Sequence, residues 1–123
     1  MNWEVIYTED AEQDLQDIYE YISDVLLEPK TAQGQINRIM DSIESLDNLP
    51  LRHHLYNNEP WRTKGLRVMP VDNYLVFYLP DESRGNVAIV RIKFIYNDNK
   101  YSHRKLLHNK RILEQHYPSS RGL

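Results

Sequence analysis

The chain has 123 residues, 41% of them hydrophobic, and it contains no cysteine. This length predicts one domain with a modest core, and the lack of cysteine excludes a disulfide framework and thiolate chemistry. No apolar run approaches the ~20 residues that span a bilayer and no signal peptide is evident, so we expect a cytoplasmic protein with no membrane partner.

The charge is distributed unevenly along the chain, although the net charge is only −3. Residues 1–60 carry 3 Lys and Arg against 13 Asp and Glu, a balance of −10. Residues 61–123 carry 12 against 5, a balance of +7. Such asymmetry predicts a polyanion or an acidic partner for the basic half. The alternative is a dipolar domain whose two halves neutralise each other in the fold.

The first half of the chain predicts a strand and two amphipathic helices. Residues 2–7 alternate in polarity, as in a short strand, and Thr8 is suited to cap the helix that follows. Apolar residues then recur at steps of three and four over about Glu9–Leu26 and Thr31–Leu46, and Pro29 is expected to end the first helix. Two such helices with a short connection predict an antiparallel helix hairpin.

The second half predicts three antiparallel strands. Gly65–Val71 and Tyr74–Leu79 form a hairpin around the Asp72-Asn73 turn, because these two side chains tolerate left-handed backbone. Asn86–Ile95 is rich in β-branched residues and predicts the last strand.

Period-two alternation predicts which face of the last strand is buried. Val90 and Ile92 fall on the expected core face, whereas Arg91 and Lys93 fall on the other. The helix residues expected to pack on the sheet are Ile18, Ile22, Ile39 and Ile43, and their expected sheet partners include Val76 and Tyr78.

Together these elements predict an α+β fold, in which an N-terminal strand and an antiparallel helix hairpin pack on a small, mainly antiparallel sheet. The domain is expected to span residues 1–96. Residues 97–123 are expected to form an atypical basic C-terminal extension, weakly helical at first and then disordered.

Basic residues on the predicted strands and their approach are the candidate binding residues. Cations held on rigid strands are a common way to meet a polyanion or an acidic partner. The expected binding residues for nucleic acid or a partner are Arg62, Lys64, Arg67 and Arg91. We expect no metal site and no cofactor, since His53 and His54 are adjacent on a loop and make poor tetrahedral geometry.

Several segments occur in an order and spacing that resemble the RelE/ParE superfamily of bacterial toxin–antitoxin toxins, in the branch known as plasmid-stabilisation proteins. The resemblance covers roughly residues 2–96. The segments that carry it are Tyr7–Leu15, Ile18–Ile22, Gly65–Arg67, Asp72–Tyr78 and Val90–Ile92.

This resemblance implies a small toxin that a cognate antitoxin holds inactive. RelE-like members cut messenger RNA in the ribosomal decoding site, and ParE-like members poison DNA gyrase. We therefore expect a ribosome-dependent endoribonuclease, an mRNA interferase whose partners are the antitoxin, the ribosome and mRNA. The alternatives are a gyrase poison of the ParE type, or an inactive toxin-fold module that only binds its antitoxin. A homodimer or a hetero-oligomer is compatible with each.

Resemblance to the nuclease branch implies a candidate catalytic group. Arg67 and Arg91 would grip a phosphate, with Lys93 or Tyr96 as proton carrier. The alternative is that Arg67 and Arg91 pair with acidic residues of the first helix, such as Asp14 or Asp17.

Two departures from the nuclease pattern favour the other activities. RelE-like toxins place an arginine after the aromatic residue that opens the third strand, and here Leu75 follows Tyr74. The arginine-rich run that follows the last strand in many members is replaced here by Ile95–Asp98.

Overall fold

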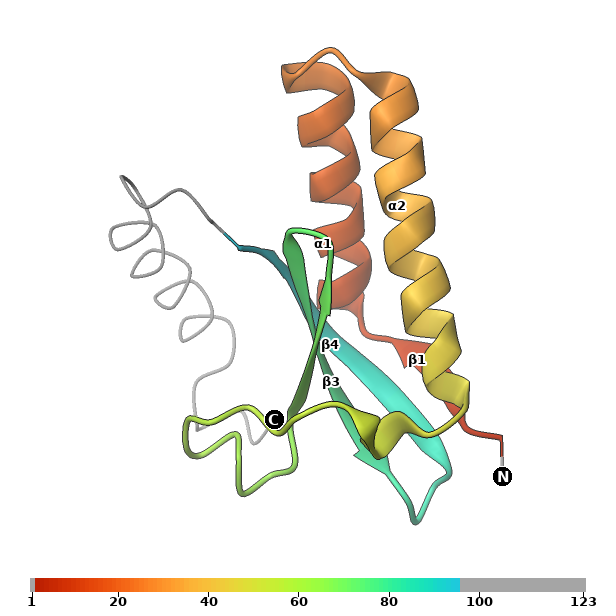
Figure 1. The fold of residues 1–123 in the computed structure, drawn as a ribbon, viewed down its shortest axis with the longest axis vertical. Coiled ribbons are helices and arrows are strands. Elements are labelled where there is room, and N and C mark those ends of the chain that lie inside the picture. The colour runs from red at the N-terminus through yellow and green to blue at the C-terminus, as the bar shows by residue number, and fades with distance from the viewer. Residues whose placement is uncertain (1, 96–123) are drawn as a thin grey trace.

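The computed structural model describes residues 2–95, which form a sheet with two helices packed on one of its faces (Figure 1). The predicted α+β fold is confirmed. In chain order the elements are β1 (Glu4–Tyr7), α1 (Glu9–Glu20), a π-helical turn (Tyr21–Val25), α2 (Pro29–Glu44), two 3₁₀ turns (Ser45–Asp47 and Pro50–Arg52), β2 (Arg67–Val71), β3 (Tyr74–Asp81) and β4 (Asn86–Phe94).

The sheet has four strands in the order β1-β4-β3-β2. β2, β3 and β4 are antiparallel neighbours, and β1 adds to β4 in parallel. The predicted hairpin turn is confirmed, since Asp72 has a φ of 53° and connects β2 to β3. A parallel β1 follows from the topology, because the helix hairpin carries the chain across one face before β4 is reached.

The helix hairpin differs from the prediction at Pro29. This residue begins α2 instead of ending α1, because proline lacks only an N–H that the first turn leaves unpaired anyway. α1 ends earlier than expected and continues as a π-helical turn, after which Leu27 takes a φ of 56°. The side chain of Thr8 accepts a hydrogen bond from the Ala11 N–H, so the predicted helix cap is confirmed.

The main core lies between the helices and the sheet. Ile22 and Ile43 are 7% and 0% exposed, as predicted, and Ile39 is fully buried. Ile18 is partly buried against the same cluster. The sheet contributes Met69, Val71, Tyr74, Val76, Tyr78, Val87, Ile89 and Ile92.

A β-bulge overturns the predicted alternation of β4. Arg91 pairs with Phe77, but Tyr78 pairs with Ile89, so Val90 is the extra residue. Ile89 and Ile92 therefore both face the helices, whereas Val90 joins a second cluster on the opposite face of the sheet. The prediction that Val90 packs under the helices is wrong, since simple alternation cannot anticipate an inserted residue.

Residues 53–66 form a long loop that covers the outer edge of β2. Leu55 bridges to Arg67 in antiparallel fashion, and the Tyr56 N–H donates to the Leu66 carbonyl at 2.8 Å. Trp61 lies in the second cluster with Phe77. The loop therefore both shields a strand edge and closes the second face of the sheet.

Within residues 2–95, every helix is too short or too polar to cross a membrane. The candidate proton carrier Tyr96 and the C-terminal extension 97–123 lie outside the described residues.

Candidate functional site

The predicted cations fall into two separate groups. Arg91 and Lys93 lie on β4 at the free edge of the sheet, beside α1. Arg67 begins β2, and Arg62 and Lys64 are exposed on the long loop that precedes it.

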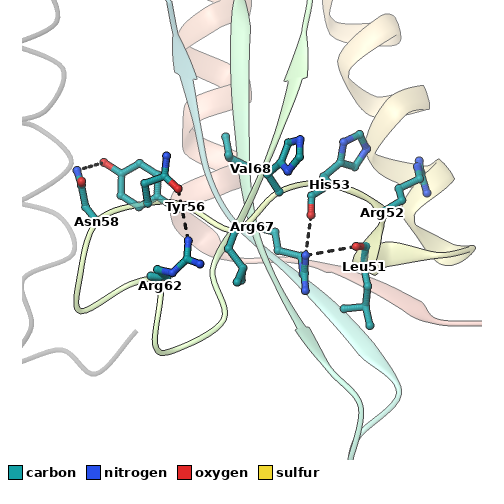
Figure 2. Close-up of a pocket in the computed structure, with 11 residues that line it drawn as sticks. Leu51, Arg52, His53, Tyr56, Asn58, Arg62, Arg67 and Val68 are labelled. Atoms are coloured by element: carbon teal, nitrogen blue, oxygen red, sulfur yellow. Dashed lines mark hydrogen bonds between the residues drawn. The ribbon is translucent and has the colours of Figure 1, made fainter.

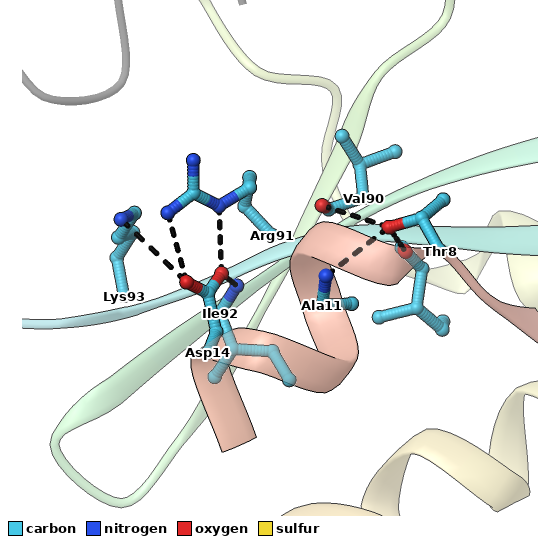
Figure 3. Close-up of polar contacts among 8 residues, drawn as sticks. Thr8, Ala11, Asp14, Val90, Arg91, Ile92 and Lys93 are labelled. Carbon is cyan, nitrogen blue, oxygen red and sulfur yellow. Dashed lines mark hydrogen bonds and ion pairs between the residues drawn. The ribbon is translucent and has the colours of Figure 1, made fainter. Parts of the chain in front are cut away.

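Arg91 is held by Asp14 in a two-pronged ion pair (Figure 3). The Arg91 Nε and Nη2 atoms donate to the two carboxylate oxygens of Asp14 at 2.7 and 2.8 Å. The two side chains are 4% and 8% exposed. Pairing with an acidic residue of the first helix was the sequence-based alternative to phosphate binding. The Arg91 guanidinium therefore makes a structural contact with Asp14.

The Asp14 carboxylate also closes the edge of β4. β1 pairs with β4 only as far as Ile89, which leaves the later backbone groups of β4 without a neighbouring strand on the side opposite β3. The Thr8 hydroxyl donates to the carbonyl of Ile89 at 2.8 Å, and Asp14 accepts from the Ile92 N–H at 2.9 Å. The start of α1 thus replaces a strand partner, which is why the carboxylate must be buried.

Lys93 extends the same cluster, with its Nζ atom 3.8 Å from the Asp14 carboxylate. Burial lowers the pKa of the Lys93 ammonium, although the nearby Asp14 opposes that shift, while the positive charge of Arg91 adds to it. The more distant carboxylates of Asp17 and Asp10 act on Lys93 in the same direction as Asp14, so acidic side chains of α1 face both cations of β4.

Arg67 does not join Arg91. Its cross-strand partner is Tyr78, whereas the partner of Arg91 is Phe77, and consecutive strand residues point to opposite faces. The Arg67 Nη1 atom donates to the His53 and Leu51 carbonyls at 2.6 and 3.3 Å, and so ties the loop to β2.

The loop and the start of β2 enclose an open pocket of 790 Å³, which we call the loop pocket (Figure 2). Its lining contains three arginines and two histidines but no acidic residue among those that the structure describes. The lining residues are Leu51, Arg52, His53, His54, Leu55, Tyr56, Asn57, Asn58, Arg62, Arg67 and Val68.

Positive charge in the loop pocket affects His53. Burial, followed by the nearby charges of Arg52 and His54, lowers the pKa of the His53 imidazole. The His53 Nε2 atom is buried and has no hydrogen-bond partner among the described residues. Of the residues that line the loop pocket, the sequence predicted only Arg62 and Arg67 as binding residues. The absence of acidic residues between Arg52 and Asn58 could have indicated the rest of this basic surface.

A second, more apolar groove of 530 Å³ lies between α1 and α2. Leu15, Tyr19, Ile36 and Met40 contribute its apolar surface, and polar side chains such as Gln16 and Gln33 border it. No predicted site residue lies in this groove. Among residues 2–95, no group of three or more His, Asp or Glu side chains is placed to hold a metal ion.

Comparison with known proteins places this arrangement in a family. The family described as "ParE toxin of type II toxin-antitoxin system, parDE" matches residues 5–93. No curated protein matches the chain.

Solved structures share the fold at low sequence identity. One is described as a chromosomal ParDE TA system from P. aeruginosa, with a TM-score of 0.63, 20% identity, and coverage of 76% of this chain and 97% of the other. Another is the toxin-antitoxin complex RelBE2 from Mycobacterium tuberculosis, with a TM-score of 0.55, 19% identity, and coverage of 76% and 99%.

Proposed function

We propose that this chain, which belongs to the ParE toxin family of type II toxin–antitoxin systems, inhibits growth by acting on DNA gyrase. Ribosome-dependent mRNA cleavage, which the sequence placed first, is the alternative. The observation that carries the proposal is the buried pair of Arg91 with Asp14.

Messenger RNA cleavage needs cations that converge on the scissile phosphate and a group that activates the 2′-hydroxyl. Arg91 is committed to Asp14, and Arg67 projects from the opposite face of the sheet, so these two cations do not converge on one phosphate. The position after Tyr74 is Leu75, which is half-buried opposite Lys93. Within residues 2–95 this arrangement favours a toxin that binds a protein target over one that cuts RNA.

An exposed apolar tip supports a protein target. The helix hairpin extends past the sheet (Figure 1), and its tip carries large apolar side chains at high exposure. Val25 is 64% exposed and Leu27 is 77% exposed, with Tyr21 and Leu26 beside them. Clusters of this kind mark protein-binding surfaces more often than free surface.

The partner that holds the toxin inactive is proposed to be a cognate antitoxin. The two solved structures named above are described as a ParDE system and a toxin-antitoxin complex. In this chain the groove between α1 and α2 has an apolar lining with a polar border, which suits an amphipathic helix. Exposed basic residues outside the loop pocket, such as Lys64, would then meet acidic residues of the same partner.

Induced expression with two readouts tests the target. We expect relaxed or broken plasmid DNA after induction, while messages in translating ribosomes stay intact. Purified toxin should inhibit supercoiling by purified gyrase, and co-expressed antitoxin should restore growth. Messages cut in the ribosomal decoding site, alongside normal supercoiling, would instead establish the nuclease. If DNA stayed normal, messages stayed intact and growth was unaffected, the remaining hypothesis would be an inactive module that only binds its antitoxin.

A further inference from the structure

The loop pocket is separate from the groove between α1 and α2 and from the Arg91 cluster. We propose that it binds a single-stranded nucleic acid. A backbone phosphate would contact its arginines, and a base would stack on its aromatic rings. This binding does not depend on whether the toxin acts on gyrase or on the ribosome. It adds a direct nucleic-acid contact to a protein whose net charge of −3 argues against one.

Local charge is the first reason. Arg52, Arg62 and Arg67 line the loop pocket together with two histidines, and no acidic residue is found in its described lining. A concave surface with one sign of charge focuses its field and concentrates counter-ions. The lowered pKa of the His53 imidazole, caused by burial and then by its cationic neighbours, fits this positive potential.

The arginines are held in place before any ligand arrives. Arg67 is fixed by the carbonyls of His53 and Leu51, and both bonds use only its Nη1 atom. Arg52 is held more fully, since its Nη1 atom donates to the carbonyls of Ser45, Asn48 and Leu49 and its Nη2 atom to the Ser45 hydroxyl, so it contributes mainly its positive charge to the pocket. Cations held by backbone carbonyls lose little side-chain entropy on binding, so a phosphate can be gripped at low cost.

Arg62 completes the phosphate site from the other side of the pocket. Its side chain is exposed, and its hydrogen bond to the Asn57 side chain is long, at 3.4 Å. The exposed Glu59 carboxylate also interacts with this charge, but among the described residues the Arg62 guanidinium donates only this long hydrogen bond, so it is available to bind a phosphate in the bidentate manner that arginine favours.

Aromatic and amide groups beside these cations favour nucleic acid over an acidic peptide. The Tyr56 ring stands edge-on to Phe77 at 5.5 Å, and its hydroxyl accepts from Asn58 (Figure 2). The imidazole of His54 and the amide of Asn57 line the same pocket. Rings stack on bases and amides bond base edges, and both groups are reached only when the bases are unpaired.

Binding of labelled oligonucleotides to the full-length protein tests the proposal. The probe is a fluorescent single strand of about ten nucleotides, long enough for one binding site, followed by fluorescence anisotropy over a salt series. We expect Arg62→Ala to weaken binding about tenfold at low salt and to reduce the slope of log K against log salt by about 0.7, the value for one phosphate contact on a single strand.

The matched control is Arg84→Ala. Arg84 is also an exposed arginine, with a side chain 78% exposed on the turn between β3 and β4, and it does not line the loop pocket. Binding by this variant should stay within about twofold of the parent, since it removes the same charge outside the site. His54→Ala should weaken binding with an unchanged salt slope, because it removes a stacking surface.

Three results would overturn the proposal. One is the absence of binding by the parent protein at low salt, and another is an equal loss from Arg62→Ala and Arg84→Ala. The third is competition by inorganic phosphate, a duplex of the same length or a poly-glutamate peptide that matches the single strand at equal charge. That result would mean that the pocket responds to charge alone. None of these measurements involves gyrase or growth, so their failure is distinct from failure of the proposed function.

Discussion

One carboxylate carries much of the local order around β4. Asp14 accepts two hydrogen bonds from Arg91 and one from the Ile92 backbone, while Lys93 lies within 3.8 Å. Its side chain is 8% exposed, so its charge is compensated almost entirely by these groups. A buried ion pair adds little over an apolar pair of the same shape, but losing one partner leaves an isolated buried charge.

Asp14→Asn should therefore reduce the free energy of unfolding by about 3–5 kcal/mol, since it removes the charge opposite Arg91 while keeping an acceptor for the Ile92 N–H. Chemical denaturation followed by circular dichroism measures the change. Asp17→Asn is the matched control, because Asp17 is exposed on the same helix, accepts a hydrogen bond from Gln13 and acts on Lys93 only as a weaker charge than Asp14 does. A loss of less than about 1 kcal/mol would show that solvent reaches the Arg91 guanidinium.

Because Arg91 belongs to this cluster, Arg91→Ala cannot measure a role in toxicity by itself. This substitution leaves Asp14 buried without its main partner, so any loss of toxicity would be mixed with loss of stability. Arg67→Ala is the cleaner probe of the predicted site, because within residues 2–95 Arg67 donates to backbone carbonyls and pairs with no buried carboxylate.

Lys93 predicts a pH dependence of stability. Its folded-state pKa lies below 10.5, mainly through burial, so the unfolded chain binds the proton more tightly. The free energy of unfolding contributed by Lys93 should therefore rise with pH between the folded and unfolded pKa values. Comparing the parent with Lys93→Met over this alkaline range cancels contributions from the tyrosines. Equal slopes in the two proteins would contradict the prediction.

At the scale of elements, side-chain hydrogen bonds connect neighbouring helices, turns and strands where the backbone hydrogen bonds of the sheet end. Thr8 and Asp14 take over from β1 along β4, and Tyr78 joins the sheet to the 3₁₀ turn after α2. The Tyr78 hydroxyl donates to the Pro50 carbonyl at 2.7 Å in a fully buried position. Since a buried carbonyl needs a partner, this bond fixes how the chain leaves α2 and enters the long loop.

Tyr78→Phe should destabilise the protein by about 1–3 kcal/mol, because the Pro50 carbonyl would stay buried without its donor. The matched control is Tyr21→Phe, as Tyr21 is 56% exposed at the helix hairpin tip. Thermal unfolding of both variants checks the difference. Equal stability of the two would mean that water replaces the lost donor.

For the whole molecule, function is proposed to divide among three surfaces. The groove between α1 and α2 suits an antitoxin helix, the hairpin tip suits a protein target, and the loop pocket suits a nucleic-acid strand. The loop pocket lies on other elements than the groove and the tip, and the groove and the tip use different residues of the helix hairpin, so single substitutions should separate their effects.

Leu27→Ser at the hairpin tip should relieve growth inhibition while leaving stability within about 0.5 kcal/mol of the parent, since the side chain is already 77% exposed. Leu49→Ser is the control, because Leu49 is 68% exposed and also has a positive φ, but lies away from the tip. Toxicity unaffected by Leu27→Ser would remove the tip from the proposed gyrase contact.

The complex with the antitoxin should weaken as salt rises, because exposed basic residues outside the loop pocket, such as Lys64, attract an acidic partner and salt screens that attraction. Isothermal titration at several ionic strengths measures the trend. If the affinity did not change with salt, contacts in the apolar groove alone would account for the binding.

Local patterns determined the elements of this protein. The apolar stripes of the two helices, the Thr8 cap and the Asp72 turn follow from neighbouring residues, so the sequence alone predicted them. Only tertiary structure decided which cations meet. A one-residue bulge at Val90 changed the faces of β4, and the short β1 left an edge that Asp14 fills, drawing Arg91 away from Arg67. Such pairings depend on register and on the length of neighbouring strands, which no local pattern encodes.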